Sequence, residues 1–269
     1  MTTESRAARN ERIHAVRRRI LELSHRANST HLGSALSCVE ILNSIFFAAG
    51  VTPSTMEVPD RSRIVLSKGH AAMSLYATLE DQGLIAPNLL ESYLQDGSAL
   101  WGHVTRMPGA QAIDVSTGSL GHGLSLSTGF ALGYRLRGWR SRIYCVLGDG
   151  ECEEGSVWEA ALFAGHHRLE NVTAIVDYNK IQGLGRVSSV LDIEPLADKW
   201  TSFGWTVHEV DGHDPWALDA TINVPSDRPT VVLAHTIKGK GVPRMEDTVA
   251  SHYTPAQRAD LTEYENNHA

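Results

Sequence analysis

Two polar residues at the ends of two apolar segments form a candidate site for chemistry. Asp149 lies between Gly148 and Gly150 just after one strand-like segment, and Asn179 follows the next such segment along the chain. If these strands are neighbours in one sheet, a carboxylate oxygen and an amide oxygen come together. The backbone carbonyl of Ile181 would add a third hard oxygen, and this set suits Mg²⁺ with a bound phosphate. The two glycines would let a diphosphate approach the backbone closely.

The same residues have a purely structural interpretation. Gly-Asp-Gly is a common turn, and Asn commonly caps turns and helices. Gly-Asp-Gly alone favours the turn, and Asn179 at the neighbouring strand end brings the interpretation as a magnesium and diphosphate anchor level with it. A helix that starts near Glu153 would add its N-terminal dipole to such an anion site. Spacing alone leaves both interpretations open.

The elements that must position these residues alternate between strand and helix. Short apolar segments, most of them β-branched, predict strands over 63–66, 143–147, 172–176, 206–210 and 230–235. Amphipathic or apolar patterns predict helices over 11–27, 36–50, 70–83, 123–138, 156–169, 196–204 and 215–223. This alternation predicts an α/β fold, a doubly wound and mainly parallel sheet flanked by helices. Ligands of such sheets bind beyond the carboxyl ends of the strands, where the polar and Gly-rich clusters of this chain fall.

Composition excludes several classes of function. The chain has 269 residues, 42% of them hydrophobic and 20% charged, and a formal net charge of −7. That charge gives no attraction to nucleic acid or to an acidic membrane, and no apolar run approaches the length of a membrane span. The three cysteines are sparse and unpaired in pattern, which predicts free thiols in a cytoplasmic protein. The basic run 12–19 is interpreted as the solvated face of a helix. We expect one domain over 1–269, with a flexible N-terminus over 1–9 and a tail over 256–269.

Several stretches resemble one family when they are taken in order. They are "ANSTHLGSALS", "RIVLSKGHAAMSLYA", "LWGHVTR", "STGSLGHGLSLSTGFALG", "GDGECEEGSVWEA…NVTAIVDYNKIQGLG" and "HTIKGKGVPRMEDTVASH". The Gly-Asp-Gly followed about thirty residues later by Asn resembles the thiamin diphosphate motif, and the whole set, from about residue 10 to 255, resembles transketolase. The chain is similar to the diphosphate-binding half of that enzyme, in the short form that is split over two chains. The fold implied is the thiamin diphosphate-binding fold of the PP domain.

The resemblance implies a role for particular residues. Asp149, Asn179 and the Ile181 carbonyl would hold Mg²⁺, or another divalent cation such as Ca²⁺ or Mn²⁺. The cofactor-binding set implied is His70, Gly118, Leu120, Gly148, Asp149, Gly150, Glu154, Asn179, Ile181, Lys238 and His252. Within it, Gly150, His70, Lys238 and His252 lie toward the diphosphate, and Gly118 and the Leu120 carbonyl meet the aminopyrimidine. The implied catalytic residues are His31, His70, His103 and His252, which would bind substrate hydroxyls and shuttle protons, because imidazole titrates near neutral pH.

The resemblance also implies that a partner is needed. In the family, a glutamate of the pyrimidine-binding domain activates the cofactor, and that domain follows the diphosphate domain. This chain ends at Ala269, after the last matching motif, so we expect a second subunit to supply that glutamate in an α2β2 assembly. Glu154 and Glu159 fall where the family has interface carboxylates; a charged first helical turn is the alternative. Thr30 departs from the Gly common in the family and leaves the His31 assignment less secure.

Other functions remain to be weighed at this point. The implied reaction is transfer of a two-carbon ketol unit from a ketose phosphate to an aldose or aldehyde, with sugar phosphates as substrates. An α subunit of a 2-oxoacid or acetoin dehydrogenase also carries Gly-Asp-Gly and Asn, although such chains are usually longer and lack the histidine set. A transketolase-like subunit with an unusual acceptor, or a cofactor-binding subunit without catalysis, is a further alternative. An unspecific Rossmann-like domain is disfavoured by the missing Gly-x-Gly-x-x-Gly.

Overall fold

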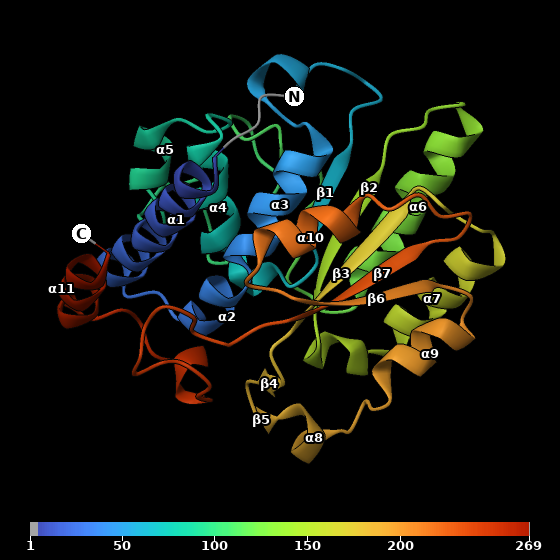
Figure 1. The fold of residues 1–269 in the computed structure, drawn as a ribbon. Coiled ribbons are helices and arrows are strands. Elements are labelled where there is room, and N and C mark those ends of the chain that lie inside the picture. The colour runs from blue at the N-terminus through green and yellow to red at the C-terminus, as the bar shows by residue number, and fades with distance from the viewer. Residues whose placement is uncertain (1–4, 269) are drawn as a thin grey trace.

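Five parallel strands form the central sheet of the protein. The computed structural model describes residues 5–268. The strand order is β1-β2-β3-β7-β6 (Figure 1), with bounds β1 Arg63–Leu66, β2 Ile143–Gly148, β3 Val172–Tyr178, β6 Thr206–Asp211 and β7 Thr230–His235. All four pairings are parallel, and β2 and β3 are neighbours, so the condition for a joint site at their ends is met.

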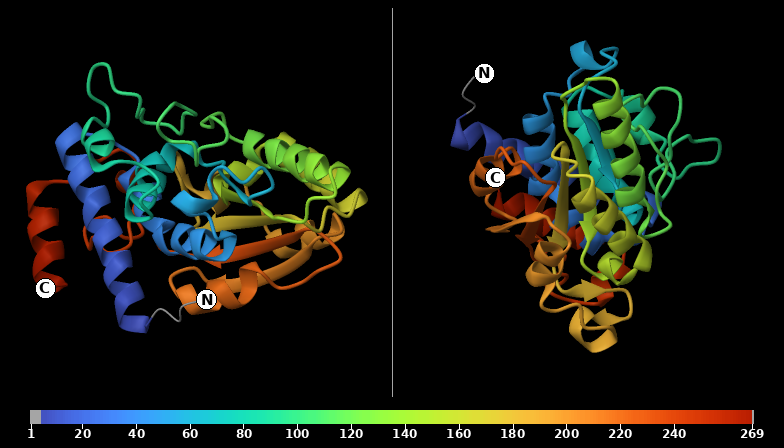
Figure 2. Two further views of the ribbon diagram at one scale, coloured as in Figure 1. Left: turned by 90° about the horizontal axis from the view of Figure 1, so that it is seen from above. Right: turned by 90° about the vertical axis from the view of Figure 1, so that its right-hand side faces the viewer.

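Helices cover both faces of the sheet. The side chains of β2 alternate, so that Tyr144 and Val146 join one core while Ile143, Cys145 and Leu147 join the other. Helices on the first face are α1 Arg6–Ala27, α2 Leu32–Ser37, α3 Val39–Ala49, α4 Ala72–Asp81 and α10 Pro215–Ile222; those on the second are α6 His122–Leu136, α7 Gly155–His166 and α9 Leu196–Ser202. Figure 2 shows α6 and α10 on opposite sides of the strands. The prediction of a doubly wound α/β fold is confirmed.

Some local structure differs from the sequence prediction. The helix expected over 36–50 is divided at Cys38, which has a non-helical backbone (φ −107°) between α2 and α3. Short elements were not anticipated: α5 Pro87–Glu91, α8 Val187–Val190, the hairpin of β4 Ile181–Gln182 and β5 Gly185–Arg186, and the 3₁₀ turns Pro53–Thr55, Gly69–Ala71, Gly150–Glu153 and Ala250–His252.

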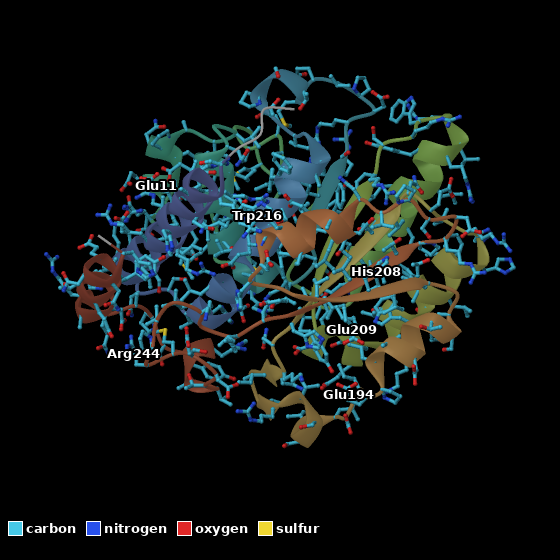
Figure 3. The ribbon with its side chains drawn as sticks, in the orientation of Figure 1. Glu11, Glu194, His208, Glu209, Trp216 and Arg244 are labelled. Atoms are coloured by element: carbon cyan, nitrogen blue, oxygen red, sulfur yellow. The ribbon has the colours of Figure 1, made fainter. Side chains whose placement is uncertain are left out.

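The two ends of the chain carry helix. Residues 1–4 of the expected flexible segment 1–9 lie outside the described residues, and α1 begins at Arg6. The expected tail 256–269 contains α11 Arg258–Asn267, whose Tyr264 is buried and contacts His14 of α1. Arg244, which Figure 3 labels beside α11, pairs with Asp260 of that helix at 2.5 Å. Contacts with α1 and the preceding loop therefore fasten α11 to the domain.

The basic run of α1 is not simply a solvated face. Arg17 is buried, and its guanidinium contacts both carboxylate oxygens of Glu40 at 2.6 Å. His213 completes this group, because its Nδ1 lies 3.2 Å from Glu40 while its Nε2 accepts the Ile237 N–H at 2.8 Å. The interpretation of the run as solvated is wrong for Arg17, because a charge can be buried when it is fully paired.

This buried pair makes stability depend on pH. Burial raises the pKa of Glu40, but Arg17 and His213 outweigh that effect and lower it from 4.5 to about 2. A carboxyl whose folded pKa is depressed contributes stability above its unfolded pKa and loses it as pH falls. We therefore expect a loss on the order of 3 kcal/mol between pH 4.5 and 2 from this group. Urea unfolding at several pH values should show a shallower acid loss in Glu40→Gln than in wild type, whereas Glu263→Gln, on the exposed face of α11, should keep the wild-type slope.

The thiols and the helices bear on two expectations from composition. Cys38, Cys145 and Cys152 are all buried and free, as predicted. Within residues 5–268, none of the helices combines the length and the apolar character that crossing a bilayer requires.

Candidate active site

A cavity of about 330 Å³ opens at the carboxyl ends of the strands. Its walls come from the segments that follow β1, β2, β3 and β7, together with the start of α2 and the loops around 103, 118 and 252. The predicted residues that line it are His31, His70, His103, Gly118, Leu120, Gly148, Asp149, Gly150, Asn179, Ile181, Lys238 and His252. Glu154 does not line the cavity; it is exposed at the N-cap of α7. The structure thus gathers into one cavity residues that lie more than 200 positions apart.

The oxygens predicted to hold a metal lie at one corner of this cavity. Asp149 is 2% exposed, and its carboxylate accepts the backbone N–H groups of Gly150, at 2.8 Å, and of Lys180. Asn179 Oδ1 accepts the Ile181 N–H at 3.1 Å, and the Ile181 carbonyl accepts Lys238 Nζ at 2.9 Å. The pairing of β2 with β3 positions this corner, since Gly148 lies opposite Asp177 in the register.

The charge balance of this corner fits a cation. Burial, with the nearby Asp177 carboxylate, raises the pKa of Asp149 to about 7 despite its two N–H donors. A buried carboxylate in this state lacks positive charge, which a divalent cation would supply. The described residues contain no group of three or more His, Cys, Asp or Glu side chains placed to hold a metal; the candidate corner instead offers one carboxylate, one amide and one carbonyl, a set that suits Mg²⁺ when water and phosphate complete its shell.

Four histidines surround the mouth of the cavity. The His31 ring is central, with ring centroids 5.4 Å from His70, 5.7 Å from His103 and 4.8 Å from His252. His31 has a left-handed backbone (φ 64°), and its N–H donates to the His252 carbonyl at 2.8 Å. Thr30, the residue that departs from the family pattern, leaves His31 in the group and contacts its Nδ1 at 3.3 Å.

Burial changes the protonation of these rings. It lowers the pKa of His31, lowers that of His70 well below the usual 6.5, and lowers that of His252 to about 3, with nearby positive groups adding to each effect. These three imidazoles are therefore neutral at pH 7, and the expectation that they titrate near neutral pH does not hold for the chain alone. A neutral imidazole still accepts a proton at one nitrogen and donates at the other.

Sequence reasoning missed a buried ion pair beneath the cavity. Lys68 Nζ pairs with Asp177, and the two side chains are 1% and 0% exposed. Lys68 also donates to the Ser34 carbonyl at 3.1 Å, and Asp177 accepts from Ser37 Oγ at 2.5 Å and from Thr236. Both charged residues occur in the strand-end clusters of β1 and β3, which was the available signal.

Glu151 is a second residue that sequence reasoning missed. Its buried carboxylate accepts the N–H of Gly121 at 2.9 Å and that of Gly148 at 3.1 Å, and also accepts from Ser67. It therefore holds the Gly-Asp-Gly loop against the start of α6. The only signal in the sequence was a carboxylate two positions after Asp149.

Close contact between two loops of the cavity requires Gly69. A Cβ at this position would lie 2.7 Å from the backbone of Thr117 and from the N of Gly118. Gly69→Ala should separate the loops that carry His70 and Gly118, at an overpacking cost of about 1–3 kcal/mol, and weaken thiamin diphosphate binding by at least about tenfold. Titration calorimetry with Mg²⁺ present checks this. Gly129→Ala, where a Cβ meets nothing within 4 Å in α6, should bind normally and gain up to about 1 kcal/mol in stability.

Comparison with known proteins assigns the chain. The family profile described as "Transketolase, thiamine diphosphate binding domain" matches residues 8–268. The chain belongs to the transketolase family. This confirms the resemblance and decides against both the unspecific Rossmann-like domain and the 2-oxoacid or acetoin dehydrogenase subunit.

Individual relatives agree with this assignment. One of the two subunits of the apulose-4-phosphate transketolase of Phocaeicola vulgatus is 37% identical over 242 residues, covering 88% of this chain and 85% of that one. The 6-deoxy-6-sulfo-D-fructose transketolase subunit SqwG of a Clostridium species is 38% identical over 241 residues, covering 88% and 87%. The crystal structure of Pichia stipitis transketolase with sedoheptulose 7-phosphate superposes with a TM-score of 0.87 at 29% identity, over 96% of this chain. This chain spans only 40% of that transketolase.

Proposed function

We propose that this chain is the N-terminal, thiamin diphosphate- and Mg²⁺-binding subunit of a two-chain transketolase. The enzyme would be a transferase that moves a two-carbon ketol unit from a ketose phosphate to an aldose or aldehyde acceptor. The observation that carries the proposal is the gathering of the metal corner and the histidine group in one cavity of a transketolase-family domain. Its buried free thiols suit a reducing, cytoplasmic compartment.

Particular residues would hold the cofactor. Asp149, Asn179 and the Ile181 carbonyl would bind Mg²⁺, which neutralises the diphosphate. Burial and the Lys68 ammonium lower the pKa of Lys238 to about 8, and a bound diphosphate would favour its charged form. The other contacts proposed are His70, His252, Gly148 and Gly150 toward the diphosphate, and Gly118 and the Leu120 carbonyl toward the aminopyrimidine.

The histidine group would manage substrate protons. Thiamin diphosphate, when bound, supplies the carbon nucleophile that carries the transferred unit. His31, His70 and His252 are neutral at pH 7, so each can accept a proton from a substrate hydroxyl and return it. Their positions around one opening would also fix the orientation of the hydroxyl groups. His103 is proposed to complete this set of hydrogen-bonding groups.

The outer face of α6 and α7 supports a partner. Leu126 is 40% exposed on α6, and Leu162 and Phe163 are 56% and 39% exposed on α7. Glu159 is exposed three and four positions before them, on the same side of α7. An apolar face with a carboxylate beside it suits burial against another subunit. We propose that a C-terminal subunit covers it, supplies the activating glutamate and forms an α2β2 assembly, with Glu154 and Glu159 at the contact.

The names of relatives favour an unusual sugar as a second possibility for the substrate. One acts on apulose 4-phosphate and another on 6-deoxy-6-sulfo-D-fructose, as those names state. A specialised donor or acceptor is therefore proposed alongside the common sugar phosphates. The chain covers the cofactor-binding region, and recognition of the sugar would depend largely on the partner.

Reconstitution tests the proposed function. The chain alone, with thiamin diphosphate and Mg²⁺, should show no ketol transfer, because the activating glutamate is proposed to come from the partner. Addition of a C-terminal transketolase subunit should restore turnover on a panel of ketose donors and aldehyde acceptors. Full turnover by the chain alone would contradict the two-chain proposal. A reconstituted complex that binds the cofactor and transfers nothing would instead support a non-catalytic binding subunit.

A further inference from the structure

A second cavity lies at the opposite edge of the sheet from the cofactor cavity. It has a volume of about 480 Å³, and its lining includes Arg135, Trp139, Arg140, Arg142 and Asn171. Arg142 directly precedes β2 and Asn171 directly precedes β3, so this cavity faces the amino ends of the strands. A strand of six residues separates the two edges by roughly 20 Å. A ligand in this cavity would therefore leave the cofactor site free.

The positive charge around this cavity is not neutralised by carboxylates. Arg135 donates to the His167 carbonyl at 2.6 Å, and Arg142 donates to Thr173 Oγ1 at 3.2 Å and the Val224 carbonyl at 3.4 Å. The Arg137 guanidinium lies 5.0 Å over the Trp139 ring, and Arg140 has no hydrogen bond or ion pair within residues 5–268.

Arginines elsewhere in the chain behave differently. Arg9 pairs with Asp219, Arg61 with Asp114 and Arg244 with Asp260. Glu170 is the sole carboxylate among the described residues that line the second cavity. In a chain with a net charge of −7, four neighbouring arginines without a carboxylate partner are a local excess that an anion would neutralise.

A buried acceptor in the same cavity points to more than a simple anion. Asn171 is 9% exposed, and its Nδ2 donates to the Ala131 carbonyl at 3.1 Å, but its Oδ1 is buried without a hydrogen-bond partner in the described part of the chain. A buried acceptor without a donor is unfavourable, so a ligand group that carries an N–H or O–H would stabilise it. Trp139 offers a half-buried aromatic wall beside these polar groups.

We propose that this cavity binds a small organic phosphate. The phosphate binds the guanidinium groups of Arg140 and Arg142, and a hydroxyl or amino group of the ligand donates to Asn171 Oδ1. A sugar phosphate and a nucleotide share this chemistry. Because the cavity lies beyond the opposite ends of β2 and β3, the ligand binds together with the cofactor rather than in competition with it.

Calorimetry on the chain saturated with thiamin diphosphate and Mg²⁺ tests this proposal. Ribose 5-phosphate, AMP, inorganic phosphate and adenosine are titrated in turn. At least one organic phosphate should bind more tightly than inorganic phosphate, and adenosine should not bind. Binding of ribose 5-phosphate alone identifies a sugar phosphate as the ligand, and binding of AMP alone identifies a nucleotide.

Matched variants separate this cavity from other sites. Arg140→Gln changes an exposed side chain without internal partners, so it should fold normally and weaken organic phosphate binding by about tenfold. Arg258→Gln, on the exposed surface of α11, should bind as wild type does. Equal affinity for inorganic and organic phosphate, binding that Arg140→Gln leaves unchanged, or no binding at all would overturn the proposal.

Discussion

Replacing Asp149 with asparagine is expected to weaken Mg²⁺-dependent binding of thiamin diphosphate by at least about 100-fold, because even groups that only support metal ligands are worth 10–100-fold. Asparagine keeps the size of the side chain and an oxygen that can accept the Gly150 and Lys180 N–H groups. What it removes is the negative charge at the metal corner. Calorimetric titration of the cofactor at fixed Mg²⁺ measures the effect.

The same substitution should not destabilise the cofactor-free chain. The pKa of Asp149 is raised to about 7 by burial and by Asp177, so ionisation of this carboxyl costs stability as pH rises from about 4 to 7. At pH 8 the full cost applies, and Asp149→Asn should leave thermal stability equal or higher while binding is lost. Asp96→Asn, at an exposed position, should change neither property. Wild-type affinity in Asp149→Asn would contradict the assigned role.

Breaking the buried pair beneath the cavity is expected to have the largest effect on stability. Burial would lower the pKa of Lys68, but the Asp177 carboxylate holds it above its usual value; burial would raise the pKa of Asp177, but Lys68 and the hydroxyl donors hold it below. Both groups are therefore charged at pH 7. Asp177→Ala leaves the ammonium of Lys68 buried without its counter-charge, which should cost about 3–5 kcal/mol.

A double replacement distinguishes pairing from packing at this position. In Lys68→Met/Asp177→Leu neither charge is buried, so most of the lost stability should return. Urea unfolding of wild type, the single variant and the double variant gives the three free energies. If the double variant is no more stable than Asp177→Ala, the loss comes from packing or from the hydrogen bonds of Ser37 and Thr236, and the charge argument fails.

The sequence predicted the fold because each strand carries its own local signal. Short β-branched segments give all five strands of the sheet, and strand ends in a parallel sheet meet at one edge. Asp149 and Asn179 could therefore be placed together from the order and character of these segments alone. The pairing of β2 with β3 shows why these two positions, thirty residues apart, form one corner.

Other parts of the site have no local signal. His103 lies in an irregular loop and His252 in a short turn, so their meeting with His31 follows from tertiary packing, and only the family resemblance indicated it. The pairs Arg17–Glu40 and Lys68–Asp177 were missed because periodicity treats charged residues as exposed. Their burial depends on partners 23 and 109 positions away.

A crystal structure with thiamin diphosphate and Mn²⁺ in place of Mg²⁺ is the most direct test of the central claim, that two adjacent strand ends hold a divalent cation and its diphosphate. Anomalous scattering locates the Mn²⁺ ion without reference to the protein atoms. We predict one strong peak within coordination distance of Asp149, Asn179 Oδ1 and the Ile181 carbonyl. A diphosphate bound in the cavity with no peak at that corner, or with the metal held by other residues, would contradict the account.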